Sequence, residues 1–120
     1  MDKAEFGATG EERACQHLRA EGYRIVARNW RTRLGEIDIV ARDGDVLVFV
    51  EVKTRTGPGF GGAEGAVGPA KRRRLVAAAK AFLAAYGCEL AARFDVVALE
   101  GNDIRLVRDA FQVDDVWATP

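Results

Sequence analysis

The chain of 120 residues has two cysteines, three prolines, one histidine and no long hydrophobic run. Cys15 and Cys88 do not form a CxxC pair, so we expect two reduced thiols rather than a disulfide framework or a cysteine zinc site. The longest apolar run, 46–50, is far shorter than the roughly 20 residues that a membrane span needs. The first twenty residues carry four acidic side chains and no secretory signal. These absences predict a cytoplasmic protein that does not bind membranes.

Several catalytic motifs are absent as well. The sequence has no GxSxG, P-loop or dinucleotide-binding fingerprint. The glycine-rich stretch 56–68 lacks the Gly-Lys-Ser/Thr ending of a phosphate-binding loop. His17, the single histidine, lies in the first predicted helix, where a surface role is expected. The chemistry, if any, must therefore come from other residues.

The composition is typical of a globular protein, with 48% hydrophobic and 30% charged residues, and the length predicts one domain over 1–120. The net charge of zero is unevenly distributed: residues 1–93 hold 16 Lys and Arg against 12 acidic residues, and 94–120 hold 2 against 6. A local basic surface can still bind nucleic acid. Arginine outnumbers lysine fourteen to four, which suits phosphate binding but is also typical of a GC-rich genome.

Hydrophobic periodicity predicts two helices and five strands. Thr9 and Glu12 fit a capping box that begins the first helix, and Glu21-Gly22 ends it. Pro69 begins the second helix and Gly87 ends it. The predicted strands span 23–30, 36–41, 46–52, 93–99 and, less regularly, 104–107. The order α-β-β-β-α-β(-β) predicts an α/β fold with a mixed sheet flanked by helices.

Carboxylates gather on the hairpin formed by 36–41 and 46–52. A two-residue turn centred on Asp43-Gly44 pairs positions whose numbers sum to 87, and one on Gly44-Asp45 gives 89. The strand 46–52 is apolar on both faces until Glu51, as in central strands. In either register one face collects these four residues: Glu36, Asp38, Glu51 and Lys53.

One lysine cannot neutralise three carboxylates that lie on the same face. Like charges across a sheet are destabilising, so additional positive charge is expected. A hard divalent cation with oxygen ligands is the natural candidate. The alternative is an exposed strand end whose charges are solvated.

The same residues resemble a known signature. Asp38, followed after twelve residues by Glu51-Val52-Lys53, resembles the D…ExK motif of restriction-endonuclease-like (PD-(D/E)xK) nucleases. The wider segments resemble the YraN family of small bacterial proteins over nearly the whole chain: Gly10-Glu-Glu12, Arg28-Asn29, GEIDIVA at 35–41, FVEVKTR at 49–55, Phe60-Gly61, 71–74 and Phe94-Asp95. That family resembles archaeal Holliday-junction resolvases, so the resemblance implies a restriction-endonuclease-like fold.

The resemblance also implies roles for individual residues. Asp38 and Glu51 match the carboxylates that bind Mg²⁺, with Mn²⁺ as an alternative, and the carbonyl of Val52 matches a third ligand. Lys53 matches the lysine that orients or activates the attacking water. Glu12 lies where resolvase-like members carry a helix glutamate near the metal, although the capping box explains it equally well. Glu36 belongs to the family motif without a defined role.

Two basic clusters are candidate contacts to DNA phosphates. One comprises Arg24, Arg28, Arg31 and Arg33, and the other comprises Lys71, Arg72, Arg73 and Arg74. The second cluster opposes the dipole of its helix, which suggests an anionic partner, but four consecutive side chains cannot all contact it. Arg55 extends from the Lys53 strand, and the stretch 56–68 could close over DNA. Trp30 could stack on an unpaired base, although a core position is the expected one.

The sequence thus predicts a metal-dependent endodeoxyribonuclease that acts on branched or damaged DNA. A nucleic-acid-binding protein of the same fold without turnover, and a protein–protein adaptor, are the alternatives. No base-reading motif is present, so recognition of DNA structure is expected. Resolvase-like nucleases pair in homodimers because two strands need two sites, and a homodimer is expected here by that analogy.

Overall fold

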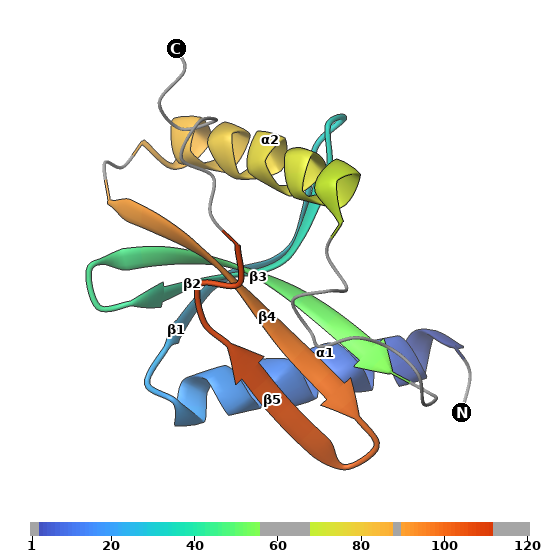
Figure 1. Ribbon diagram of the computed structural model, residues 1–120. Coiled ribbons are helices and arrows are strands. Elements are labelled where there is room, and N and C mark those ends of the chain that lie inside the picture. The colour runs from blue at the N-terminus through green and yellow to red at the C-terminus, as the bar shows by residue number, and fades with distance from the viewer. Residues whose placement is uncertain (1–2, 56–67, 88–89, 112–120) are drawn as a thin grey trace.

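The computed structural model describes residues 3–55, 68–87 and 90–111, which form a five-stranded sheet with one helix on each face (Figure 1). The elements follow the predicted order: α1 (Lys3–Ala20), β1 (Arg24–Arg31), β2 (Glu36–Asp43), β3 (Val46–Arg55), α2 (Pro69–Tyr86), β4 (Ala91–Glu100) and β5 (Asp103–Val107). The prediction of an α/β fold with a mixed sheet is confirmed.

The strands lie in their sequence order, β1-β2-β3-β4-β5. All neighbours are antiparallel except β3 and β4, which are parallel and are joined through α2. A parallel pair requires such a crossover. The prediction of a central β3 is confirmed, and its residues 47–51 are all buried.

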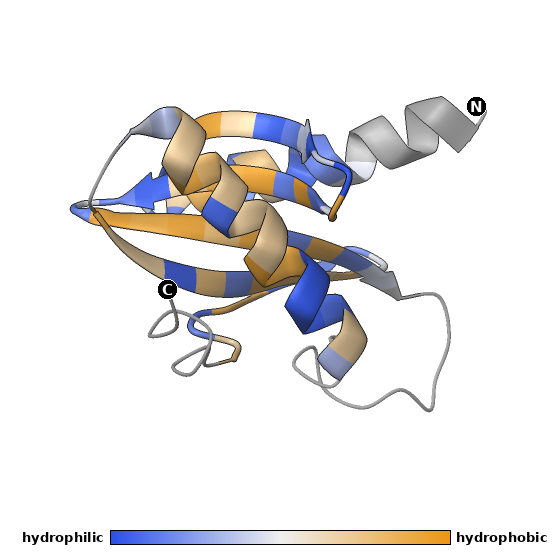
Figure 2. Cartoon of the chain, turned by 90° about the horizontal axis from the view of Figure 1, so that it is seen from above, coloured by the Kyte–Doolittle hydropathy of each residue, from blue (hydrophilic) through white to orange (hydrophobic). Residues whose placement is uncertain are grey.

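The sheet separates two hydrophobic cores. Beneath α2, Phe49 and Phe94 pack with Val76 and Phe82. On the other face, Leu18 of α1 packs with residues that include Val48, Val50 and Val97. Figure 2 shows the apolar strands under α2, whose first turns are hydrophilic where they pass the edge of this core. The charged end of α2 is therefore left near the ends of the strands.

The hairpin register decides between the two predicted turns. Asp43 pairs with Val46 and Ile39 pairs with Val50, so paired positions sum to 89 and the turn is Gly44-Asp45. Gly44 has φ +62°, the left-handed conformation that glycine adopts without strain. Continued by one step, this register sets Asp38 opposite Glu51.

Some predictions about local structure are corrected. α1 begins at Lys3, so Thr9 lies inside the helix and the capping box with Glu12 is wrong. A hydrophobic stripe does not mark where a helix begins, and α1 extends through residues 3–13 before the stripe that starts at Ala14. Trp30 packs edge-on against Phe82, with ring centroids 5.2 Å apart, and is a core residue as expected.

Other predictions lie outside the described residues. The glycine-rich stretch 56–67, with Phe60-Gly61, and Cys88 belong there. Cys15 is a buried thiol with no disulfide. Among the residues that the structure describes, no helix is long and apolar enough to span a membrane.

Candidate functional site

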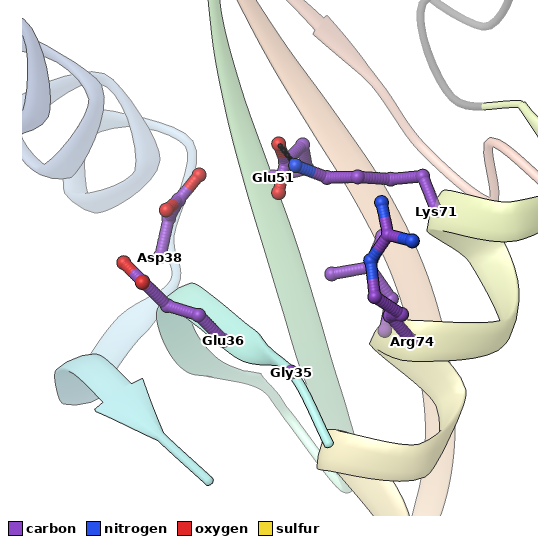
Figure 3. Close-up of a pocket in the computed structure, with 7 residues that line it drawn as sticks. Gly35, Glu36, Asp38, Glu51, Lys71 and Arg74 are labelled. Carbon is purple, nitrogen blue, oxygen red and sulfur yellow. Dashed lines mark ion pairs between the residues drawn. The ribbon is translucent and has the colours of Figure 1, made fainter. Parts of the chain in front are cut away.

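A polar pocket of about 250 Å³ opens where the ends of β2 and β3 meet the first turns of α2. Its lining residues are Gly35, Glu36, Asp38, Glu51, Lys71, Arg74 and Leu75. Figure 3 shows Lys71 reaching from α2 to Glu51 on β3, with Asp38 and Glu36 of β2 on the opposite side of Glu51. Three of the predicted site residues on the hairpin therefore converge, and two from the second basic cluster join them.

Glu51 is the buried carboxylate of this pocket, with a residue exposure of 5%. Its Oε1 lies 3.0 Å from Lys71 Nζ and 3.5 Å from Lys53 Nζ. The two lysines come from α2 and β3, and they provide the compensation that a buried carboxylate requires. Lys53 is thus placed on the face of Glu51, as strand alternation predicts.

Asp38 lies where the regular β2–β3 ladder ends. Beyond the Ile39–Val50 pair, the N–H of Val52 donates to Asp38 Oδ2 at 2.8 Å. Ile37 and Val40 both pack beneath α2, although strict alternation would put them on opposite faces. β2 is therefore irregular at Asp38, and a side-chain carboxylate takes the place of a main-chain acceptor.

Burial, and then the adjacent Glu51 carboxylate, raise the pKa of Asp38 to about 7. The hydrogen bond from Val52 N–H lowers the pKa and so opposes this shift, whereas repulsion from Glu36 raises the pKa slightly further. Two carboxylates that share a half-buried site favour holding a proton or another cation between them. This is the electrostatic environment in which a divalent cation binds.

Glu36 and Gly35 form the outer rim of the pocket. Glu36 Oε2 lies 3.3 Å from Arg31 Nε, its partner across the β1–β2 ladder. A Cβ atom on Gly35 would lie 2.5 Å from the carbonyl oxygen of Arg74. Glycine is therefore required here by the close approach of β2 to the backbone of α2.

The second basic cluster divides by helical position. Lys71 and Arg74, three residues apart, face the pocket. Arg72 instead lies over the ring of Phe111, 5.2 Å from its centroid, and Arg73 is exposed. Lys71 and Arg74 therefore lie on a different side of the helix from Arg72, as helical spacing predicts.

The first basic cluster is partly neutralised. Arg28 Nη1 lies 3.0 Å from Glu12 Oε2, and the second α1 glutamate, Glu11, lies 4.0 Å from Arg28 Nη2. Glu12 is therefore paired with the predicted phosphate contact Arg28, and it is not among the residues that line the pocket with Asp38 and Glu51. Arg33 is exposed at the β1–β2 turn, and the side chain of Arg55 lies outside the described residues.

Sequence reasoning missed a second buried carboxylate, Asp95, which is 1% exposed. It accepts hydrogen bonds from Tyr23 Oη at 2.8 Å, Arg93 Nε at 2.9 Å and the N–H of Asp109 at 2.9 Å. Arg93 also contacts Asp43, and these carboxylates raise the pKa of its guanidinium. Since both carboxylate oxygens of Asp95 already accept hydrogen bonds, we interpret this network as structural. An Asp inside an apolar strand was the available signal.

The pocket offers oxygen donors suited to magnesium. Within residues 3–55, 68–87 and 90–111, no three His, Cys, Asp or Glu side chains converge closely enough to form a complete cage. Mg²⁺ does not need one, because it is commonly held by one or two carboxylates and keeps several waters. Asp38 and Glu51, with the main chain at Val52, fit that requirement.

Comparisons with known proteins identify relatives along most of the chain. A family model described as "Uncharacterised protein family UPF0102" matches residues 10–99. A UPF0102 protein of Halorhodospira halophila is 50% identical over 111 residues, covering 92% of this chain and 90% of the relative. One of Symbiobacterium thermophilum is 52% identical over 111 residues, covering 88% and 94%. The matched residues include the hairpin and the first turns of α2.

Proposed function

The chain belongs to the UPF0102 family, the YraN-like family that its motifs resemble, and from its pocket we propose that it is a metal-dependent nuclease that hydrolyses phosphodiester bonds in DNA. One observation carries the proposal: the buried Glu51 carboxylate lies beside Asp38 and contacts two lysines. We place the activity in the cytoplasm, on a restriction-endonuclease-like fold.

Asp38, Glu51 and the carbonyl of Val52 would hold Mg²⁺ or Mn²⁺. Bound there, the metal would lower the pKa of a water and neutralise charge on the phosphoryl oxygens. Lys53, whose Nζ lies 3.5 Å from Glu51 Oε1, would orient the attacking water. Lys71 and Arg74 line the same pocket. Their ammonium and guanidinium groups would bind phosphate oxygens of the DNA.

Two other functions use the same surface differently. A nucleic-acid-binding protein without turnover would keep Lys71 and Arg74 on phosphates and leave the carboxylates without a catalytic role. A protein–protein adaptor would bind an acidic partner through its basic residues. The paired Asp38 and Glu51 favour the nuclease, because neither alternative needs two carboxylates beside each other in a half-buried pocket.

A cleavage assay separates these functions. We expect the purified full chain, with Mg²⁺ or Mn²⁺, to cut one or more of these substrates: linear duplex, single strands, flaps, four-way junctions and the corresponding RNA. Lys53→Ala should abolish cutting, whereas Lys80→Ala, a lysine of α2 outside the pocket, should not. DNA binding without cutting would support the binding protein. Neither binding nor cutting would support the adaptor.

Lys71→Met should have opposite effects on two ligands. The ion pair at 3.0 Å makes Lys71 a competitor for Glu51, so its removal should tighten Mn²⁺ binding in the absence of DNA by roughly threefold to fivefold. The same change should weaken DNA binding and flatten its salt dependence. Calorimetry and fluorescence anisotropy measure the two effects. Arg73→Met, exposed on the same turn and outside the pocket, is the matched control for metal binding. Weaker metal binding in Lys71→Met would contradict the competition.

A further inference from the structure

The turn between β1 and β2, residues 32–35, is held by a small hydrogen-bond network. The N–H of Thr32 donates to the carbonyl of Gly35 at 2.8 Å. The Thr32 hydroxyl accepts from the N–H groups of Leu34 and Gly35 at 3.0 and 3.1 Å. Gly35 in turn lies against the backbone of Arg74, so the turn is anchored to α2. The position of its tip is therefore well defined.

Leu34 stands at that tip with 59% of its surface exposed. A single exposed leucine is ordinary on a protein surface. Its surroundings are not: the next two residues along the chain, Gly35 and Glu36, line the pocket. Arg31 precedes the turn and pairs with Glu36, whereas Arg33 lies within the turn directly before Leu34, and both arginines are exposed. The apolar tip thus follows two exposed arginines and is fixed beside the carboxylates.

This arrangement has the chemistry of a wedge for stacked bases. Proteins that distort DNA insert an apolar side chain such as leucine between base steps while arginines bind the neighbouring phosphates. Trp30, the aromatic residue of the same segment, packs on Phe82 and is unsuited to this role. Leu34 is the apolar side chain that the segment presents to solvent.

We propose that Leu34 inserts between bases beside the scissile phosphate and so directs the enzyme to DNA whose stacking is already weakened. The proposal rests on the proposed function and names its substrate class: branched, gapped or mismatched DNA. Unstacking costs a few kcal/mol in a regular duplex and least where a base is mismatched or unpaired. A rigid wedge therefore makes binding selective, because binding to a regular duplex includes the full free energy of unstacking.

The test measures binding and base unstacking, neither of which needs cleavage. The ligands are a regular duplex and a four-way junction, each carrying 2-aminopurine, in Ca²⁺ or EDTA. We expect the wild type to prefer the junction and to raise 2-aminopurine fluorescence. Leu34→Ala should reduce the preference by about tenfold and remove the fluorescence increase, because the alanine methyl cannot separate two bases. Tyr86→Ala, which removes the other large exposed hydrophobic among the described residues, should change neither.

The possible failures are distinguishable. If the wild type cleaves DNA but Leu34→Ala keeps its preference and fluorescence change, the wedge is wrong and the nuclease stands. If the wild type binds none of the DNAs, both the wedge and the proposed nuclease function are wrong. If Leu34→Ala instead changes the sedimentation coefficient of the protein, Leu34 is a contact between two copies and the wedge is overturned.

Discussion

Asp38→Asn should abolish cleavage and divalent-metal binding while making the metal-free protein more stable. A carboxamide is a poor ligand for Mg²⁺, and loss of the several kcal/mol that a metal supplies corresponds to a rate reduction on the order of 10³-fold or more. The asparagine oxygen can still accept from Val52 N–H, so the local backbone is retained. The variant removes a negative charge beside buried Glu51, and this relieves repulsion.

The stability gain should depend on pH with a defined sign. Burial and Glu51 raise the pKa of Asp38 from 3.8 to about 7, so between these values the native state holds a proton that the unfolded state has lost. Stability conferred by this proton is complete below pH 4 and is lost as the pH rises to 7. The wild type should therefore lose up to about 4 kcal/mol from this group across that range, and Asp38→Asn should not.

Urea denaturation in EDTA at pH 5 and pH 8 measures this difference, and calorimetry with Mn²⁺ measures metal binding. Asp45→Asn, an exposed aspartate in the hairpin turn, is the matched control and should behave as the wild type does. If Asp38→Asn destabilised the protein equally at both pH values, the carboxylate would be structural. Unchanged Mn²⁺ affinity would remove Asp38 from the metal site.

The hairpin shows how much of the site the sequence predicts. Strand alternation and two candidate turns placed Glu36, Asp38, Glu51 and Lys53 together, and the observed register is one of the two. These residues are close in sequence, and a two-residue turn fixes the register over a few residues. The helix that begins at Pro69 and ends before the left-handed Gly87 was predicted for the same local reasons.

Contacts between distant segments were not predictable in this way. Lys71 reaches Glu51 only because α2 crosses the end of β3, and the intervening residues set no periodicity that reveals the crossing position. The network around Asp95 joins residues up to 85 positions apart. The predicted beginning of α1 was wrong for a different reason. Thr9 fits a capping pattern, but the residues before it also form helix.

Gly35→Ala should be among the most damaging single-methyl changes in this protein. The added Cβ would lie 2.5 Å from the carbonyl oxygen and 3.1 Å from the carbonyl carbon of Arg74, both backbone atoms that cannot rotate away. β2 and α2 must then separate, which costs about 1–3 kcal/mol as overpacking does elsewhere. The separation also moves Lys71 and Arg74 away from Glu51, so metal and DNA binding should both change.

Chemical denaturation and Mn²⁺ calorimetry test this, with Gly68→Ala as the control because a Cβ there meets nothing within 4 Å. Gly68 immediately precedes α2, and its substitution should cost less than about 1 kcal/mol as a change of cap residue. If Gly35→Ala unfolds, Leu75→Val leaves only a small cavity at a buried pocket residue and still tests whether the packing of α2 positions the site. Wild-type stability of Gly35→Ala would mean that β2 and α2 do not touch. A loss of Mn²⁺ binding in Gly35→Ala and Leu75→Val, but not in Gly68→Ala, would show that the contact between β2 and α2 positions the carboxylates of the site.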